Sequence, residues 1–181
     1  MNLVGKVFWI FGGFQGNRKL GYINDVFSLN LETLRFEKIE TKGIKPAKRA
    51  NHGTCVIGNK LMVFGGCYEG TKFNDLWFLD LNTLEWTMVN QDPGKLIPDS
   101  REGMSILAYK DKFLILFGGL HDVTNERSDM YLYNLEMNIW EKLEKEKSCY
   151  NSLAEISEMN KSIASKNNIN CSSKKKDYNK L

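Results

Sequence analysis

Residues 61–86 read LMVFGGCYEGTKFNDLWFLDLNTLEW, in which two adjacent glycines, Gly65 and Gly66, close a run of large apolar side chains. Glycine weakens a strand interior, because it has no side chain to pack and loses more backbone entropy on ordering than other residues. The arrangement nevertheless occurs three times: KVFWIFGG ends at Gly13, KLMVFGG at Gly66 and KFLILFGG at Gly119. The chain therefore contains an internal repeat.

Two further blocks recur around the glycine pairs. After each pair comes a block that runs from an aspartate to an aromatic residue: DVFSLNLETLRF (25–36), DLWFLDLNTLEW (75–86) and DMYLYNLEMNIW (129–140). Before the second and third pairs come PAKRANHGTCVI (46–57) and PDSREGMSILAY (98–109), each with an arginine in its fourth position. The repeated unit therefore has the same parts in a constant order.

The periodicity of these parts indicates short strands. LMVF and FLILF are unbroken apolar runs, which is typical of a strand covered on both faces. In the aspartate blocks, large apolar residues alternate with smaller or more polar ones, and the closing aromatic starts another strand after a tight turn. Four short antiparallel strands make one small sheet, which must stack on copies of itself to bury its two apolar faces. We therefore expect an all-β fold.

This repeat resembles the kelch repeat, whose blades carry a Gly-Gly after the second strand, an aromatic-rich third strand and a following Trp. Kelch repeats have a period of about 50 residues, and the Gly-His and Trp-Asp signature of WD40 repeats is missing here. The resemblance implies a partial β-propeller of four-stranded antiparallel blades over residues 1–143. Two blades are expected at 46–90 and 98–143, with an incomplete blade at 5–40. The glycines are then structural, at points where the aromatics of the blade leave no room for a Cβ.

The propeller is expected to be incomplete. The first repeat begins at its second strand, near Lys6, without an innermost strand before it, which gives eleven strands in total. Propellers close with four to eight blades, and nothing after Leu143 resembles a strand that could complete a ring. We therefore expect the chain to be a fragment of a longer kelch protein, with further blades or self-association completing the propeller through its exposed faces.

Residues 144–181 have a different composition. From Ser148 to Leu181 the chain contains seven Ser, six Asn and six Lys, which is too polar to build a core. We expect a largely disordered, low-complexity tail. Ser152 and Glu155 form a capping-box pattern, followed by apolar residues at near-helical spacing, which favours one short helix at 152–164, either transient in solution or docking on a partner or a blade.

Charge and cysteine content limit the class of partner. Residues 1–143 hold 17 Lys/Arg and 17 Asp/Glu, so the formal charge of +3 comes from the tail. A nucleic-acid partner would favour a basic face on the folded part, so none is expected. The four cysteines form no Cys-x-x-Cys pair, which indicates reduced thiols and a cytoplasmic location. No uncharged apolar stretch approaches membrane-spanning length, and no signal peptide is expected.

The sequence favours binding over catalysis. Its two histidines, His52 and His121, have no second histidine or cysteine at ligand spacing, so we expect no metal, cofactor or catalytic residue. Arg49 and Arg101 recur in register and are interpreted as structural. The alternative is a ligand-binding or catalytic propeller of the galactose-oxidase type, with His52 facing the inner channel, although that enzyme's histidine cluster and cross-linked tyrosine cannot be assembled here.

The connections between strands select a surface. In an antiparallel blade the turns between strands one and two and between strands three and four share one rim, where they are minimal. The long segments 14–24, 67–74, 120–128, 40–48 and 91–100 share the opposite rim, and long loops on a rigid scaffold are where recognition concentrates. The residues there that could anchor a partner are Arg18, Lys19, Tyr22, Lys45, Lys48, Tyr68, Lys72, His121 and Arg127.

We therefore predict a non-enzymatic protein-interaction module that binds another protein through these loops. The kelch resemblance implies a scaffold or a substrate adaptor, because members of the family serve in scaffolds and in adaptors for ubiquitin ligases. The sequence does not identify the partner, since one fold hosts many functions.

Overall fold

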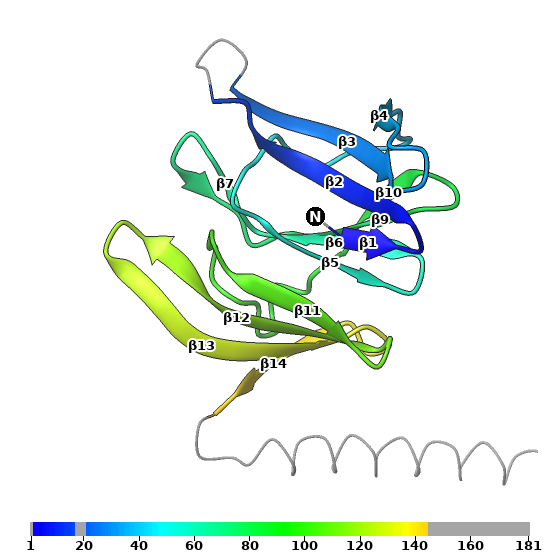
Figure 1. Cartoon of the computed structure of the whole chain (residues 1–181). Helices are drawn as coiled ribbons and strands as arrows, with labels where there is room; N and C mark the ends of the chain where they lie inside the picture. Colours follow the sequence, from blue (N-terminus) through cyan, green and yellow to red (C-terminus); the bar gives the residue numbers. More distant parts are fainter. Residues whose placement is uncertain (1, 17–20, 145–181) are drawn as a thin grey trace, which may run out of the picture. The chain divides into compact units, whose positions relative to one another are not determined.

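The computed structural model describes residues 2–16 and 21–144, which form three four-stranded antiparallel sheets and one two-stranded sheet (Figure 1). The first blade comprises β1 (Asn2–Val4), β2 (Val7–Phe14), β3 (Tyr22–Asn30) and β4 (Phe36–Ile39). The second comprises β5 (Gly53–Ile57), β6 (Lys60–Phe64), β9 (Leu76–Asp80) and β10 (Glu85–Met88). The third comprises β11 (Ser105–Tyr109), β12 (Phe113–Asp122), β13 (Asn125–Asn134) and β14 (Ile139–Leu143). The all-β prediction is confirmed.

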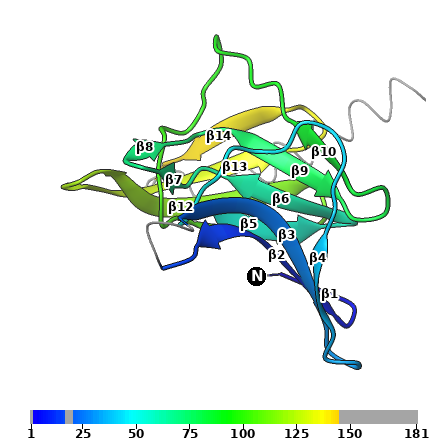
Figure 2. The ribbon, with the colours of Figure 1, turned by 90° about the horizontal axis from the view of Figure 1, so that it is seen from above.

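Each blade uses its strands in chain order, so that every strand pairs with its neighbour in the repeat. The first strands of consecutive blades lie next to one another, β1 beside β5 and β5 beside β11. Figure 2, seen from above, shows the second blade between the other two. These first strands are therefore the inner strands, as the repeat pattern predicted.

The expected lack of an inner strand in the first blade is wrong. β1 pairs with β2 in antiparallel register, with Leu3 opposite Phe8, and a turn at Gly5 joins the two strands. Asn2 Nδ2 also donates a hydrogen bond to Thr54 Oγ1 of β5 over 2.8 Å. The sequence signal was missed because three residues are too few to show an alternating pattern. Each of the three blades is therefore complete in strand number.

The apolar core lies between the blades. Along β6, alternate side chains point to opposite faces, so Leu61 and Val63 pack toward the first blade while Met62 and Phe64 pack toward the third. All four are at most 1 % exposed. The prediction of a strand covered on both faces is thus confirmed for β6, and the second blade is held by a separate apolar cluster on each side.

Two segments predicted as long loops, 67–74 and 120–128, contain strands. In the third blade, β12 and β13 continue past the glycine pair to a turn after Asp122, with Leu120 opposite Glu126. Residues 67–72 form the small hairpin of β7 (Cys67–Tyr68) and β8 (Thr71–Lys72). In the first and third blades the strand pairing continues beyond the glycines after a register shift, which is a β-bulge. The sequence pattern alone does not predict such a bulge.

The glycine pairs are required by both conformation and space. All six glycines have φ between +60° and +114°, where L side chains are strained. A Cβ on Gly66 would lie 2.7 Å from the Ala50 carbonyl oxygen and from His52 Cβ, and one on Gly12 would lie 2.8 Å from the Arg49 carbonyl oxygen. The expected crowding is therefore real, but the neighbours are the segments around the repeat arginines rather than the aromatics of the blade.

The two repeat arginines are structural, as predicted. Arg49 is fully buried, donates to the carbonyl oxygen of Gly65 over 2.9 Å, and makes a two-pronged ion pair with Asp75 at 2.6 and 2.8 Å. Arg101 repeats the arrangement with Asp129 in the third blade. The aspartates that open the second and third blocks therefore each neutralise an arginine that would be costly to bury alone.

Residues 1–142 form one compact unit, and a second unit begins at Leu143. The predicted tail and its helix at 152–164 lie outside the described residues. None of the residues that the structure describes forms a helix long and apolar enough to cross a membrane.

Candidate functional site

The rim that carries the connections between second and third strands brings together side chains from all three blades. We call it the hairpin rim and define it by residues 14–16, 21–22, 67–72, 102–103 and 120–127. The backbone of the hairpins is joined to the arginine segments by two isolated bridges, between Ala50 and Cys67 and between Glu102 and Leu120. The second and third hairpins are thus fixed to the segments that lead into the inner strands.

Aromatic side chains connect the first and second blades at this rim. Tyr22 of β3 meets Tyr68 of β7 edge to face, with ring centroids 5.3 Å apart. The ring centroids of Phe14 of β2 and Tyr22 are 5.0 Å apart. Burial, followed by the nearby Cys67, raises the pKa of the Tyr22 hydroxyl. Two of the residues predicted from the sequence as partner contacts, Tyr22 and Tyr68, are therefore direct neighbours.

A polar network connects the second and third blades. Lys72 Nζ forms an ion pair with Glu102 Oε1 at 3.2 Å and donates to the carbonyl oxygen of Leu120 over 3.1 Å. The other oxygen of Glu102 accepts a hydrogen bond from Asn51 Nδ2 over 2.9 Å. That bond, followed by one from Cys67, lowers the pKa of Glu102. The Lys72 side chain is only 13 % exposed, and both of its partners belong to the third repeat, so it connects the second and third blades.

Cys67 lies under this network as a neutral thiol. Burial raises its pKa to about 11, and the neighbouring Glu102 carboxylate acts in the same direction. Since the thiolate is the nucleophilic form of cysteine, Cys67 lacks the chemistry of a catalytic nucleophile. Its side chain is buried, and its sulfur lies 4.0 Å from Asn51 Nδ2.

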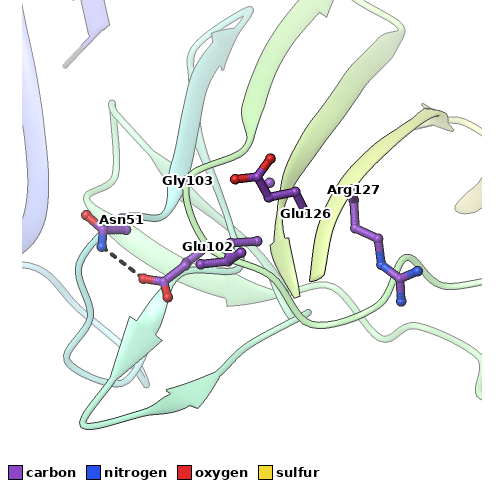
Figure 3. A pocket seen from close by; sticks show the side chains of 7 residues that line it. Asn51, Glu102, Gly103, Glu126 and Arg127 are labelled. Carbon is purple, nitrogen blue, oxygen red and sulfur yellow. Dashed lines mark hydrogen bonds between the residues drawn. The ribbon is translucent and has the colours of Figure 1, made fainter. Parts of the chain in front are cut away.

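A pocket of about 530 Å³ opens beside the network (Figure 3). Its lining residues are Asn51, Glu102, Gly103, Gly119, Leu120, Glu126 and Arg127. Glu126 and Arg127 are neighbours in β13, so their side chains point to different sides, as Figure 3 shows. Arg127 donates to Asp99 Oδ2 over 2.6 Å. The exposed Glu126 carboxylate is left to face the pocket and the solvent.

The other predicted contacts are distributed differently. His121 Nδ1 donates to the carbonyl oxygen of Ser100 over 2.7 Å, which fixes its ring beside the third hairpin. Lys45 and Lys48 are exposed on the connection between the first two blades, and no hydrogen bond or ion pair within the described residues joins them to the network. Arg18 and Lys19 lie outside the described residues.

Sequence reasoning missed Asn51 and Glu102, which hold the rim together. Glu102 directly follows Arg101, and Asn51 lies two residues after Arg49, so the sequence pattern groups both with the structural arginine segments. Because those segments bridge to the hairpins, the residue that follows Arg101 is carried onto the rim. Glu102 stands at the repeat position of Ala50, and this change of residue type was the available signal.

His52, the residue on which the alternative function depended, is packed between the first two blades. Its ring lies edge to face on Phe11, with centroids 5.3 Å apart. Burial, followed by the positive charge of Arg49, lowers its pKa to about 4. In the part of the chain that the structure describes, no three His, Cys, Asp or Glu side chains form a group that could hold a metal ion.

Comparison with known proteins decides the family. The model of the KLHDC2/KLHL20/DRC7 Kelch-repeats domain matches residues 1–159. The chain belongs to the kelch-repeat family. Its three sheets are therefore blades of a partial kelch propeller, and kelch domains of this kind generally act as protein-interaction modules.

Individual kelch relatives agree. The chain is 36% identical to Kelch domain-containing protein 1 of Mus musculus over 124 residues, which are 68% of this chain and 30% of that protein. It is 34% identical to Kelch domain-containing protein 2 of Bos taurus over 120 residues, 66% and 29% of the two chains. It is 32% identical to Acyl-CoA-binding domain-containing protein 4 of Arabidopsis thaliana over 141 residues, 77% and 20%. The chain thus spans less than a third of the length of these curated relatives.

Proposed function

We propose that this kelch chain is a scaffold or substrate adaptor that binds a partner protein through the hairpin rim. The observation that carries the proposal is the linkage of the three blades at that rim. Tyr22 and Tyr68 join the first two blades, and Lys72 and Glu102 join the second and third. A partner therefore meets one pre-organised surface, and little ordering entropy is lost when it binds.

The exposed part of the rim has the composition of a recognition surface. Phe14 is 52% exposed and Val123 is 87% exposed, at the ends of the first and third hairpins. Tyr68 and Arg127, which are half-buried, supply two of the residue types enriched at binding hot spots. Among the residues predicted from sequence, we retain Tyr22, Tyr68, His121 and Arg127 as direct contacts and assign Lys72 to positioning them. We further propose that the partner is a cytoplasmic protein.

The test places a photo-crosslinking amino acid at Tyr68 on the hairpin rim and, in a matched variant, at Asn82 on the opposite rim. Crosslinked proteins from cell extract are identified by mass spectrometry, and the partner found is purified for titration. We expect crosslinks from position 68 and none from position 82. In the titration, Tyr68→Ala combined with Glu126→Lys should weaken binding at least tenfold.

The control in the titration is Glu136→Lys on the opposite rim. Glu136 pairs with Lys112 where both side chains are about half exposed, so this reversal costs little stability. It should leave the affinity within twofold of the original. Crosslinks from position 82 would place the partner on the opposite rim, and binding that survives the double variant would likewise contradict the proposal.

A further inference from the structure

The outer face of the first blade, which points away from the second blade, carries apolar residues. In the second blade, the residues at the same positions of the repeat are buried against the first blade. The pairings β1–β2, β2–β3 and β3–β4 place one set of apolar residues on this face, away from the second blade. The set is Leu3, Phe8, Ile10, Phe27, Leu29 and Phe36. In the register of the repeat their equivalents in the second blade are Val56, Leu61, Val63, Trp77, Leu79 and Trp86.

The difference between the two sets is their burial. Leu61 and Leu79 are 0% exposed and Trp86 is 4% exposed, because the first blade covers them. On the outer face of the first blade, Leu3 is 51% exposed and Phe36 is 58% exposed. This face therefore has the pattern of a blade interface without the neighbouring blade that covers it.

The third blade presents the complementary face. Leu107, Ile115, Phe117 and Met130 occupy the repeat positions of Cys55, Met62, Phe64 and Leu76, the residues with which the second blade packs on the third. Phe64 is 0% exposed, whereas Phe117 is 48% exposed and Leu107 is 50% exposed. The chain thus carries both halves of an interface that it already forms twice internally.

We propose that the outer face of the first blade binds the outer face of the third blade in a second copy of this chain. Such a contact is heterologous, and two of them close a ring when the rotation allows it. Two copies give six blades, within the four to eight with which propellers close, whereas three copies would give nine. The proposal is independent of the partner-binding proposal, since it uses sheet faces and leaves the hairpin rim free.

The first measurement is sedimentation equilibrium of the 181-residue chain over a hundredfold range of concentration. We expect a species of twice the 20.8 kDa chain mass. A single-chain mass over the whole range overturns the proposal. In that case, pairing that begins only after deletion of residues 144–181 would show that the tail occupies the face.

The second measurement uses one charge on each face. Phe36→Asp and Phe117→Asp change residues that are half exposed in the single chain, so each variant should fold, as near-UV circular dichroism can check. Each should abolish the two-chain species alone, and mixing the two should restore one, because each variant keeps the face that the other has lost. Val123→Asp, in the exposed turn between β12 and β13, is the control and should leave the mass unchanged.

The remaining outcomes contradict the proposal. If Phe36→Asp abolishes pairing while Phe117→Asp does not, two first blades bind each other and the contact is not heterologous. If the mass grows beyond two chains with concentration, the contacts form but the ring does not close. If the mixture of variants stays single-chain, the two faces are not complementary.

Discussion

Substituting His52 by methionine should remove a pH-dependent loss of stability without disturbing the fold. The chain itself supplies the precedent, because Met104 occupies the same place one blade later. A Cβ on Gly66 would lie 2.7 Å from His52 Cβ, and a Cβ on Gly119 would lie 2.9 Å from Met104 Cβ. The two side chains therefore fill equivalent sites beside equivalent glycines.

The magnitude follows from the pKa of His52. Burial, and then the charge of Arg49, lowers it from 6.5 to about 4 in the folded chain. Below pH 6.5 the unfolded chain therefore binds a proton that the folded chain does not, so the free energy of unfolding falls with pH until about pH 4. Between pH 7.5 and pH 5 this amounts to a loss of about 2 kcal/mol from His52.

Urea unfolding at pH 7.5 and pH 5, at a fixed protein concentration, measures the effect. On going from pH 7.5 to pH 5, the free energy of unfolding of the original chain should fall by about 2 kcal/mol, and that of His52→Met should fall much less. Asp129 and Glu102 also have lowered pKa values, but their ordinary values of 3.8 and 4.5 place their effect at lower pH in both chains. At pH 7.5 the variant should be equally stable or more so, because His52 Nδ1 is buried without a hydrogen-bond partner among the described residues.

The reasoning is refuted if both chains show the same pH dependence, because the proton uptake would then belong to other groups. His121→Asn, at the second histidine, is the control and should retain the full effect. A large loss of stability in His52→Met at pH 7.5 would show instead that the sites of His52 and Met104 are not equivalent.

Two further substitutions test the framework, each against a matched position. Asp75→Asn should cost about 3 kcal/mol of unfolding free energy, because it leaves a fully buried arginine with an uncompensated charge. Asp25→Asn, whose partner is a half-exposed lysine, should cost less than about 1 kcal/mol by the same urea assay. Equal costs would contradict the structural role assigned to the buried arginine pair. Gly66→Ala should destabilise more than Gly70→Ala in thermal unfolding. Both glycines have φ near +90°, but only Gly66 has backbone within 3 Å of the added carbon; equal shifts in melting temperature would mean that conformation alone sets the cost.

The parts of the fold that the sequence predicts are those that recur. Three glycine pairs in register placed the second strands, and the alternation after each aspartate placed the third. A single copy of either pattern would be ambiguous, because short apolar runs occur in helices as well as in strands. Repetition resolved the ambiguity, since one arrangement had to satisfy all three copies.

The errors fall where a feature is short or depends on contacts between repeats. β1 has three residues, so neither periodicity nor repetition identifies it. The hairpins beyond the glycines depend on a bulge whose geometry is set by the next arginine segment, for example by the Arg49 carbonyl oxygen that accepts from Gly13 N over 2.8 Å. Contacts of this kind are non-local, and single-sequence patterns do not contain them.

The repeat also separates framework from recognition, because equivalent positions can be compared within one chain. Arg49 and Arg101 make the same ion pair in their own blades, so a partner that contacted them could not tell one blade from the next. On the hairpin rim the equivalents differ: Lys72 of the second blade corresponds to Glu126 of the third, opposite in charge at the same place in the hairpin. A partner bound there meets a pattern that does not repeat from blade to blade. Under the proposed function, the rim supplies the residues that distinguish one blade from the next, while the repeated residues hold that rim in place.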